Sequence, residues 1–357
     1  MENWKKEAEL ERKDGGMEDK VFTWTGGAFV HNHFRLDDLV NERTPEEISP
    51  EMATYLKRYT DGSFSLRAIT AYLNEMFDEE MLITDTQHPS YVLDENYDNF
   101  EDEDKVQFFK ESAREKTIDL LTTCILERAN VIKQTSDLPH VLSGVEADIL
   151  SNRGDLTVRN DALKQLDFVT ASFHSSIWHA AGHESARTGT EFIDMYHYVV
   201  ENKNVDMLSH PSYYVPDDIK TKMTPGDWSE LLQNMKDANV AYEINLDSTN
   251  LLYNKGRNLD RGILMEALKI GTPLMIGFDF HYMSDWGVHP SPKLILDPEE
   301  AKKLFEEHAS NGGASKLLAR VLGNICALEQ IGLHPHDILN SSKDKFLQWL
   351  QVDRNSK

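Results

Sequence analysis

The stretch LDFVTASFHSS, residues 166–176, decides the fold class because a short apolar run ends directly at a histidine. Residues 168–173 have the length and composition of a buried strand, so His174 is expected at the carboxyl end of that strand. The preceding stretch GVEADILSNRGDL, residues 144–156, places Glu146 in a similar apolar run. Both stretches predict buried strands that carry polar side chains toward one edge of a sheet.

The same alternation of apolar runs and helical patterns extends along most of the chain. The apolar runs are residues 28–30, 81–83, 141–150, 168–173, 207–208, 241–244 and 274–276. Helical spacing is found at residues 66–77, 106–133, 190–201, 227–238 and 261–270, and again in the tail at 301–309, 315–331 and 343–350. This rhythm predicts a parallel sheet or an α/β barrel, although it does not fix the number of strands.

Composition sets limits on the class of protein. The 357 residues suit one large α/β barrel with additions, or two small domains. The formal net charge of −24 disfavours broad binding along nucleic acid. No apolar run approaches the roughly 20 residues of a membrane span, and the charged N-terminus does not resemble a secretory signal. With only two cysteines, the chain is expected to be cytoplasmic and to lack a disulfide framework.

Histidines and carboxylates recur where the predicted strands end. In chain order they are His31, His33, Asp85, His88, Glu146, His174, His210, Asp279 and His281. One such residue carries little weight, but the joint pattern predicts a metal site at the carboxyl end of a barrel. A spacing of two on a strand predicts that His31 and His33 point to the same side. Imidazole and carboxylate are ligands for Zn²⁺, Mn²⁺ or Fe²⁺, and paired ions suit phosphoryl transfer by a metal-bound hydroxide.

These motifs resemble the PHP (polymerase and histidinol phosphatase) superfamily of metal-dependent phosphoesterases. The similarity rests on GVEADIL and LDFVTASFHSS, followed in order by VDMLSHP, VAYEIN and IGFDFHYMSDWG. The similarity covers roughly residues 27–290. Within the superfamily, the chain most resembles stand-alone PHP phosphatases and the PHP domain of bacterial family X DNA polymerases. The resemblance implies a distorted (β/α)7 TIM-like barrel with a C-terminal helical extension.

The resemblance also implies a division of the chain. Residues 1–26 would be a charged lead-in, residues 27–297 the barrel, and residues 298–357 helices that pack on it. Residues 36–58 would be an insertion, because the family runs almost directly from its His-x-His to a Ser-Asp-Gly segment, here Thr60-Asp61-Gly62. The roles of this insertion and of the acidic loop at 92–104 are open.

Carried over to this sequence, the family's ligands imply two to three divalent ions. The first would be held by His31, His33, Glu146 and Asp279. The second would share Glu146 and add His174 and His210. The third would use Asp61 and His281, with His88 in place of a family histidine because Thr86 stands at that position.

Catalytic and substrate-binding roles follow from the same likeness. Asp279, His281 and His174 are the candidate catalytic residues, with Asp279 or His281 moving a proton. Relatives often carry an arginine where this chain has residues 212–214, so phosphate binding is assigned to Arg35 and Arg187. Each of these arginines also fits a surface ion pair. His179 is a further candidate for substrate contact.

The predicted function is hydrolysis of phosphate esters, first of all as a phosphomonoesterase on a small phosphorylated metabolite or nucleotide. A 3′–5′ exonuclease is the alternative, which makes nucleic acid a candidate only as substrate. An amidohydrolase-type deaminase and a non-catalytic regulatory subunit are weaker alternatives. No membrane partner is expected, and the oligomeric state is open.

Overall fold

The computed structural model describes residues 17–58, 65–77, 79–89, 107–183, 188–213, 215, 217–246, 259–280 and 324–356. Several sequence predictions therefore lie outside the described residues. They concern Asp61, the acidic loop 92–104, Arg187, His281 and the helix at 301–309.

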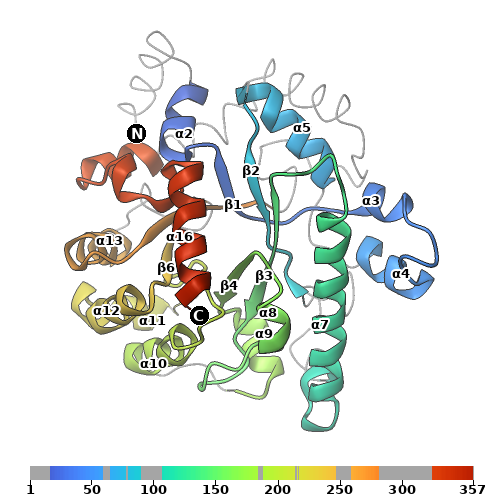
Figure 1. Ribbon diagram of the computed structural model, residues 1–357. Coiled ribbons are helices and arrows are strands. Elements are labelled where there is room, and N and C mark those ends of the chain that lie inside the picture. Colours follow the sequence, from blue (N-terminus) through green and yellow to red (C-terminus); the bar gives the residue numbers. More distant parts are fainter. Residues whose placement is uncertain are drawn as a thin grey trace.

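The seven strands form one closed parallel barrel, in the order of the chain (Figure 1). The strands are β1 (Ala28–Asn32), β2 (Leu82–Asp85), β3 (Val141–Asp148), β4 (Phe168–Ser172), β5 (Met207–Leu208), β6 (Ala241–Asn245) and β7 (Leu274–Phe280). Every apolar run expected to be a strand is one, and β7 closes the barrel by pairing with β1. The predicted fold class, an α/β TIM-like barrel with additional C-terminal helices, is confirmed.

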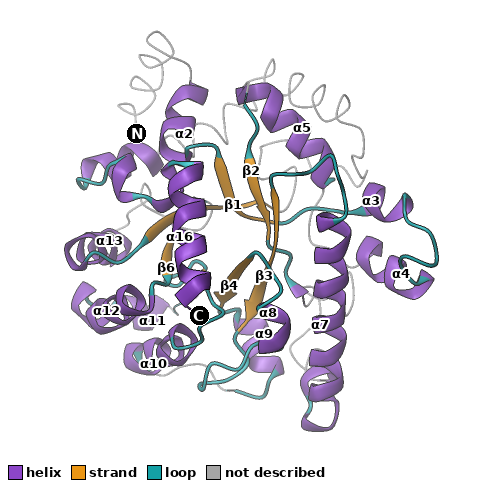
Figure 2. Ribbon diagram, viewed as in Figure 1, coloured by secondary structure: helices purple, strands orange, loops and turns teal. Residues whose placement is uncertain are grey.

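Helices surround the barrel, as Figure 2 shows. The main ones are α5 (Leu66–Phe77), α7 (Glu111–Lys133), α10 (Gly189–Val200), α12 (Ser229–Ala238), α13 (Leu259–Ile270) and α16 (Lys343–Ser356). The shorter ones are α2 (Met17–Thr25), α3 (Asp37–Asn41), α4 (Pro50–Arg58), α8 (Asn160–Leu163), α9 (Ser175–Ala180), α11 (Asp217–Lys220), η3 (Pro225–Trp228), η4 (Pro335–Asp337) and η5 (Leu339–Ser341). The single helix expected at residues 227–238 is two elements in the structure. The 3-10 helix η3 begins at Pro225 and ends at Trp228, and α12 begins at the next residue.

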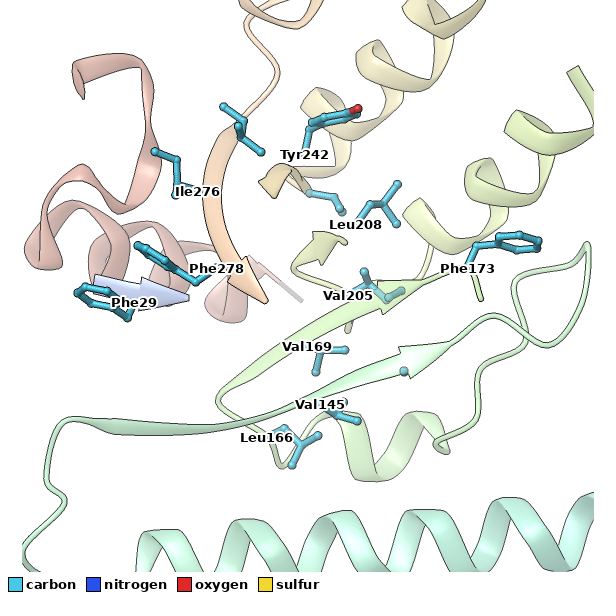
Figure 3. Close-up of a cluster of buried hydrophobic side chains, with 14 of the residues drawn as sticks. Phe29, Val145, Leu166, Val169, Phe173, Val205, Leu208, Tyr242, Ile276 and Phe278 are labelled. Atoms are coloured by element: carbon cyan, nitrogen blue, oxygen red, sulfur yellow. The ribbon is translucent and has the colours of Figure 1, made fainter. Parts of the chain in front are cut away.

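Alternate residues of each strand enter two different cores. Val169 and Ala171 of β4 point outward to the large core between strands and helices, which Figure 3 shows in part. Phe168 points inward, to a second core inside the barrel. Inward residues nearer the carboxyl ends of the strands are mostly polar, among them Thr84 of β2 and Thr170 and Ser172 of β4. The barrel interior is therefore apolar at one end and polar at the other.

The C-terminal segment closes the apolar end. Phe346 and Leu350 of α16 join the inner core with Phe168, and the rings of Phe346 and Phe168 lie 5.8 Å apart. Asn340 is fully buried and hydrogen-bonds the backbone of two strands, donating to the carbonyls of Ala28 and Ile276 and accepting from the amide of Ile276. This packing leaves the opposite, carboxyl end of the barrel for the candidate site.

Candidate metal centre

A local irregularity in β1 brings its first histidine into the barrel. Ala28 and Val30 point inward and Phe29 outward, so strict alternation would send His31 outward. The pairing with β7 shifts register between Val30 and Asn32, and His31 has a φ of 60°. Its ring consequently lies inside, 5.2 Å from that of His33. The sequence correctly placed both histidines together, but a bulge, not regular strand periodicity, is the cause.

Four side chains converge above the inner core to form the first candidate group: His31, His33, Glu146 and Asp279. Glu146 Oε2 lies 3.2 Å from Nε2 of His31 and 3.4 Å from Nε2 of His33. Asp279 Oδ1 lies 3.6 Å and 3.4 Å from the same two nitrogens. Four tetrahedral ligands about 2.0–2.1 Å from an ion are separated from each other by about 3.3–3.4 Å. These donor atoms therefore fit one divalent ion.

Glu146 also belongs to a second group, with His174 and His210. Its other oxygen, Oε1, lies 3.0 Å from Nε2 of His210 and 3.8 Å from Nε2 of His174. The carboxylate thus turns one oxygen to each group. Such a carboxylate can bridge two ions, so the geometry accommodates a binuclear centre.

A third group consists of His88, Asp148 and His174. Asp148 Oδ1 lies 2.8 Å from Nε2 of His88 and 2.8 Å from Nδ1 of His174. A neutral imidazole offers one lone pair and one N–H. If Asp148 accepts from Nδ1 of His174, then Nε2 of that ring presents its lone pair toward the second group. Asp148 can therefore orient His174 as a ligand of an ion in the second group. Alternatively, Asp148 and His174 can both bind an ion in the third group. His174 can belong to only one of these two sites at a time.

Charge is concentrated and buried in this centre. Burial raises the pKa of the Glu146 carboxyl, but the nearby His31 charge and the hydrogen bond to His210 outweigh it and hold the pKa well below its usual range. Burial lowers the pKa of His31, but the carboxylates of Glu243, Glu146 and Asp279 raise it well above its usual value. The pKa of His210 is raised against burial, mainly by Glu146. The carboxylates thus favour positive charge at this place, which a divalent cation would supply.

Three of the converging residues have left-handed backbones. His31, His210 and Asp279 have φ values of 60°, 31° and 54°. Among the described residues, one other non-glycine has positive φ, Asn239 at the end of α12. This conformation costs about 1–2 kcal/mol for a residue with a side chain, and such strain clusters at functional sites.

The remaining predicted residues take different positions. Arg35 forms an ion pair with Asp37, with 2.9 Å between Nε and Oδ2, and also donates to the carbonyl of Lys57. The sequence allowed an ion pair as the other role of Arg35, although this pair is partly buried and not at the surface. His179 donates through Nδ1 to the carbonyl of His183 at 3.0 Å, just beyond the end of α9. Neither residue belongs to the three groups, and their substrate-binding roles stay predictions.

Residues of the segment 85–88, where a third ion was predicted, make several different contacts. The Thr86 hydroxyl accepts from the amide of Asn32 at 3.0 Å, which fixes the end of β1. Asp85 forms a buried ion pair with Arg128 instead of joining a metal-binding group. His88 lies beside His174, with their rings 4.7 Å apart. The displaced histidine therefore does reach the centre.

Sequence reasoning gave no role to three buried residues of the site: Asp148, Glu243 and Asn245. Each had a detectable signal. Asp148 follows Glu146 by two residues, and Asn245 follows Glu243 by two, so each pair shares one face of a strand. The sequence signal for these three residues is an inward-facing carboxylate followed two residues later by a second inward-facing polar side chain.

The described fold and side chains thus define an α/β barrel with buried histidine–carboxylate groups that can hold metal ions. No family model matches the chain. A Shewanella piezotolerans protein named as a probable phosphatase is 32% identical over 152 residues, 42% of this chain and 56% of the relative. An Aliivibrio fischeri protein of the same description is 29% identical over 149 residues, 41% and 53% of the two chains.

A third relative, from Caldanaerobacter subterraneus subsp. tengcongensis, is also named as a probable phosphatase. It is 25% identical over 224 residues, which are 63% of this chain and 70% of the relative. The chain spans little more than half the length of the Shewanella and Aliivibrio relatives. The likeness is therefore to phosphatase-type proteins over part of their length.

Proposed function

We propose that this chain is a metal-dependent hydrolase of phosphate esters of the PHP type. The observation that carries the proposal is the position of Glu146, whose two oxygens face two separate groups of histidines. Three relatives named as probable phosphatases support the same class of reaction. Bound divalent ions would supply Lewis acidity toward the phosphate oxygens and would acidify the attacking water.

The chain's own residues suggest where the ester binds. The side chains of His31 and His33 are fully buried, and that of His210 is only 4% exposed. Asp279 and His174 are 12% and 17% exposed, so they form the accessible edge of the centre. A phosphate would approach past these two side chains. Asp279 is the group proposed to hold or pass a proton at the leaving oxygen, and the catalytic role of His174 stays a prediction.

Charge favours a small substrate. With 61 acidic and 37 basic residues, the surface repels extended polyanions, whereas a monoester needs only one local cationic site. We therefore propose a phosphomonoesterase that acts on a small phosphorylated metabolite or nucleotide. Two ions, with Zn²⁺, Mn²⁺ or Fe²⁺ as candidates, match the groups that share Glu146. A third ion depends on Asp61 and His281 and stays a prediction.

One experiment tests this function. The protein is purified without added chelator, its metals are counted per chain, and it is assayed with p-nitrophenyl phosphate, mononucleotides and labelled single-stranded DNA in Zn²⁺ or Mn²⁺. We expect at least two ions per chain and phosphate release from monoesters. Fewer than two ions would overturn the binuclear centre. Cleavage of DNA without action on monoesters would establish the exonuclease instead.

Two further readouts separate the weaker alternatives. Ammonia release from nucleosides would indicate the deaminase. Retention of metals with no turnover of any substrate would indicate a non-catalytic subunit.

We also propose that the described parts of the lead-in 1–26, the barrel 27–297 and the helices 298–357 form one structural unit. Trp24 of α2 is buried in the large core between strands and helices. Phe346 is buried in the inner core of the barrel, and Asn340 is buried against the strand backbones at the same end. None of the described helices is both long and apolar enough to cross a bilayer. The cytoplasmic location stays a prediction.

A further inference from the structure

Strand β6 contributes no member to the three groups, yet two of its side chains touch three members. Glu243 Oε1 lies 2.5 Å from Nδ1 of His31. Its other oxygen, Oε2, accepts from the backbone amide of His210 at 2.6 Å. Asn245, two residues on, donates to Asp279 Oδ2 at 3.0 Å and to Glu243 Oε2 at 3.2 Å. The three members with left-handed backbones, His31, His210 and Asp279, are thus all contacted from one strand.

We infer that Glu243 is a positioning residue that sets the geometry of both metal subsites at once, with Asn245 extending its reach to Asp279. This inference rests on the proposed function, since it takes His31 and His210 as ligands. Glu243 is itself fully buried, so its carboxylate has no role toward solvent.

The first consequence concerns the protonation of His31. A carboxylate can only accept hydrogen bonds, so Nδ1 of His31 carries the proton when Glu243 is ionised. In the neutral ring, the form that can bind an ion, the lone pair then lies on Nε2, the nitrogen that faces Glu146 and Asp279. A hydrogen bond from a carboxylate to the remote nitrogen of a ligating histidine orients the ring and increases its basicity. Glu243 therefore prepares His31 for the first ion.

The second consequence concerns His210, in the other subsite. Here Glu243 holds the backbone amide, at a residue whose φ of 31° is costly without support. With that amide fixed, Nε2 of His210 lies 3.0 Å from the oxygen of Glu146 that faces the second group. One carboxylate thus acts on the ring of one ligand and the backbone of another.

The barrel leaves room for Glu243 at a specific glycine. A Cβ added to Gly277 of β7 would lie 1.7 Å from Glu243 Oε1 and 2.6 Å from its carboxyl carbon. Only a glycine at this inward position lets the carboxylate reach across β7 toward β1. The segment IGFD of β7 therefore supplies both the ligand Asp279 and, at Gly277, the space that the Glu243 carboxylate occupies.

The test compares Glu243→Gln and Glu243→Ala with wild type and with Asp206→Asn. Asp206 is a matched control because it is also buried and accepts from a backbone amide, that of Val169 at 2.7 Å, but precedes β5 at the opposite end of the barrel. Metal-free proteins are titrated with Zn²⁺ in a chelator-buffered series. Co²⁺-loaded samples are compared by visible absorption, which reports ligand geometry, and turnover of p-nitrophenyl phosphate is measured at low and high free metal.

A glutamine can accept at only one end, so Glu243→Gln should weaken metal binding by about 10–100-fold and alter the Co²⁺ spectrum. Excess metal should restore most of its turnover, whereas His33→Ala, which lacks a ligand, should not recover. Asp206→Asn should lower the melting temperature and leave metal affinity unchanged.

Wild-type affinity in both Glu243 variants would overturn the inference and leave the proposed function intact. If Glu243→Ala does not fold, the nearly isosteric Glu243→Gln decides alone. If wild type itself retains fewer than two ions, the proposed function fails first and the inference falls with it.

Discussion

Arg128 of α7 and Asp85 of β2 form a two-point ion pair inside the protein, with 2.6 Å from Nε to Oδ2 and 2.7 Å between the second pair of atoms. Their side chains are 3% and 0% exposed. The guanidinium also donates to the carbonyl of Phe34, just beyond β1. This pair joins the outer helix layer to the carboxyl ends of two strands.

Replacing Arg128 with alanine should therefore destabilise the fold strongly. The variant leaves a buried carboxylate without its counter-charge, which typically costs about 3–5 kcal/mol. Arg67→Ala is the control, because Arg67 pairs with the exposed Glu42 and Asp137, and such pairs contribute about 1 kcal/mol or less. Denaturant unfolding of both variants measures the difference. Equal losses would show that the Asp85 pair has no special structural role.

Removing a ligand should abolish turnover with little change in fold. His33→Ala deletes one of four donors of the first group, and Asp279→Ala deletes another. We expect phosphatase activity to fall by at least about 10³-fold, as for loss of an electrostatic catalytic group, with circular dichroism unchanged. His140→Ala is the matched control, since His140 is 47% exposed, pairs with Glu80 and directly precedes β3, at the end of the barrel away from the centre. Near-normal turnover in either ligand variant would contradict the assignment of the first group.

The sequence predicted the barrel well because apolar runs and strand-end histidines are local signals. It placed His31 and His33 together, but their common direction depends on a register shift against β7, which lies almost 250 residues away and leaves no local trace. The partners of Asp85 and Glu243, Arg128 and His31, lie 43 and 212 residues away, and ion pairs and hydrogen bonds across a barrel have no fixed sequence spacing. The histidines and carboxylates at strand ends therefore indicated candidate metal ligands. Only the three-dimensional fold distinguishes the ligands from residues, such as Glu243, that hold them in position.

Asn340 should be essential for closing the apolar end of the barrel. Asn340→Ala removes three hydrogen bonds to Ala28 and Ile276 and leaves buried backbone groups unsatisfied, a loss of about 2–4 kcal/mol. The control Asn202→Ala removes a half-buried side chain that donates to Asn160 at 2.7 Å and accepts from the Asn204 amide at 3.1 Å, outside the barrel core. Thermal unfolding should show one transition at lower temperature for Asn340→Ala and little change for the control. A variant that instead melts in two separate steps would contradict the single unit proposed for barrel and tail.

Gly277→Ala tests the space beside Glu243. The added methyl would overlap the Glu243 carboxylate, and overpacking of this kind costs about 1–3 kcal/mol. We expect both lower stability and weaker metal binding, because the carboxylate must move away from His31. Gly226→Ala is the control, since its new Cβ would meet nothing closer than Thr224 Oγ1 at 3.6 Å. Unchanged metal content in Gly277→Ala, measured alongside its melting temperature, would show that Glu243 tolerates displacement.

Metal removal should destabilise the native protein. The candidate centre gathers Glu146, Asp279 and Glu243 around buried histidines, and a bound cation offsets their mutual repulsion. Ligand linkage gives about 2.7 kcal/mol per site when free ion exceeds its Kd about 100-fold. Stripping with EDTA should therefore lower the melting temperature by several degrees, and adding Zn²⁺ or Mn²⁺ should restore it. In Glu146→Gln, which loses the carboxylate shared by both groups, the same treatment should shift the melting temperature much less. A wild-type melting temperature that does not change on verified metal loss would argue that this cluster is not where the ions bind.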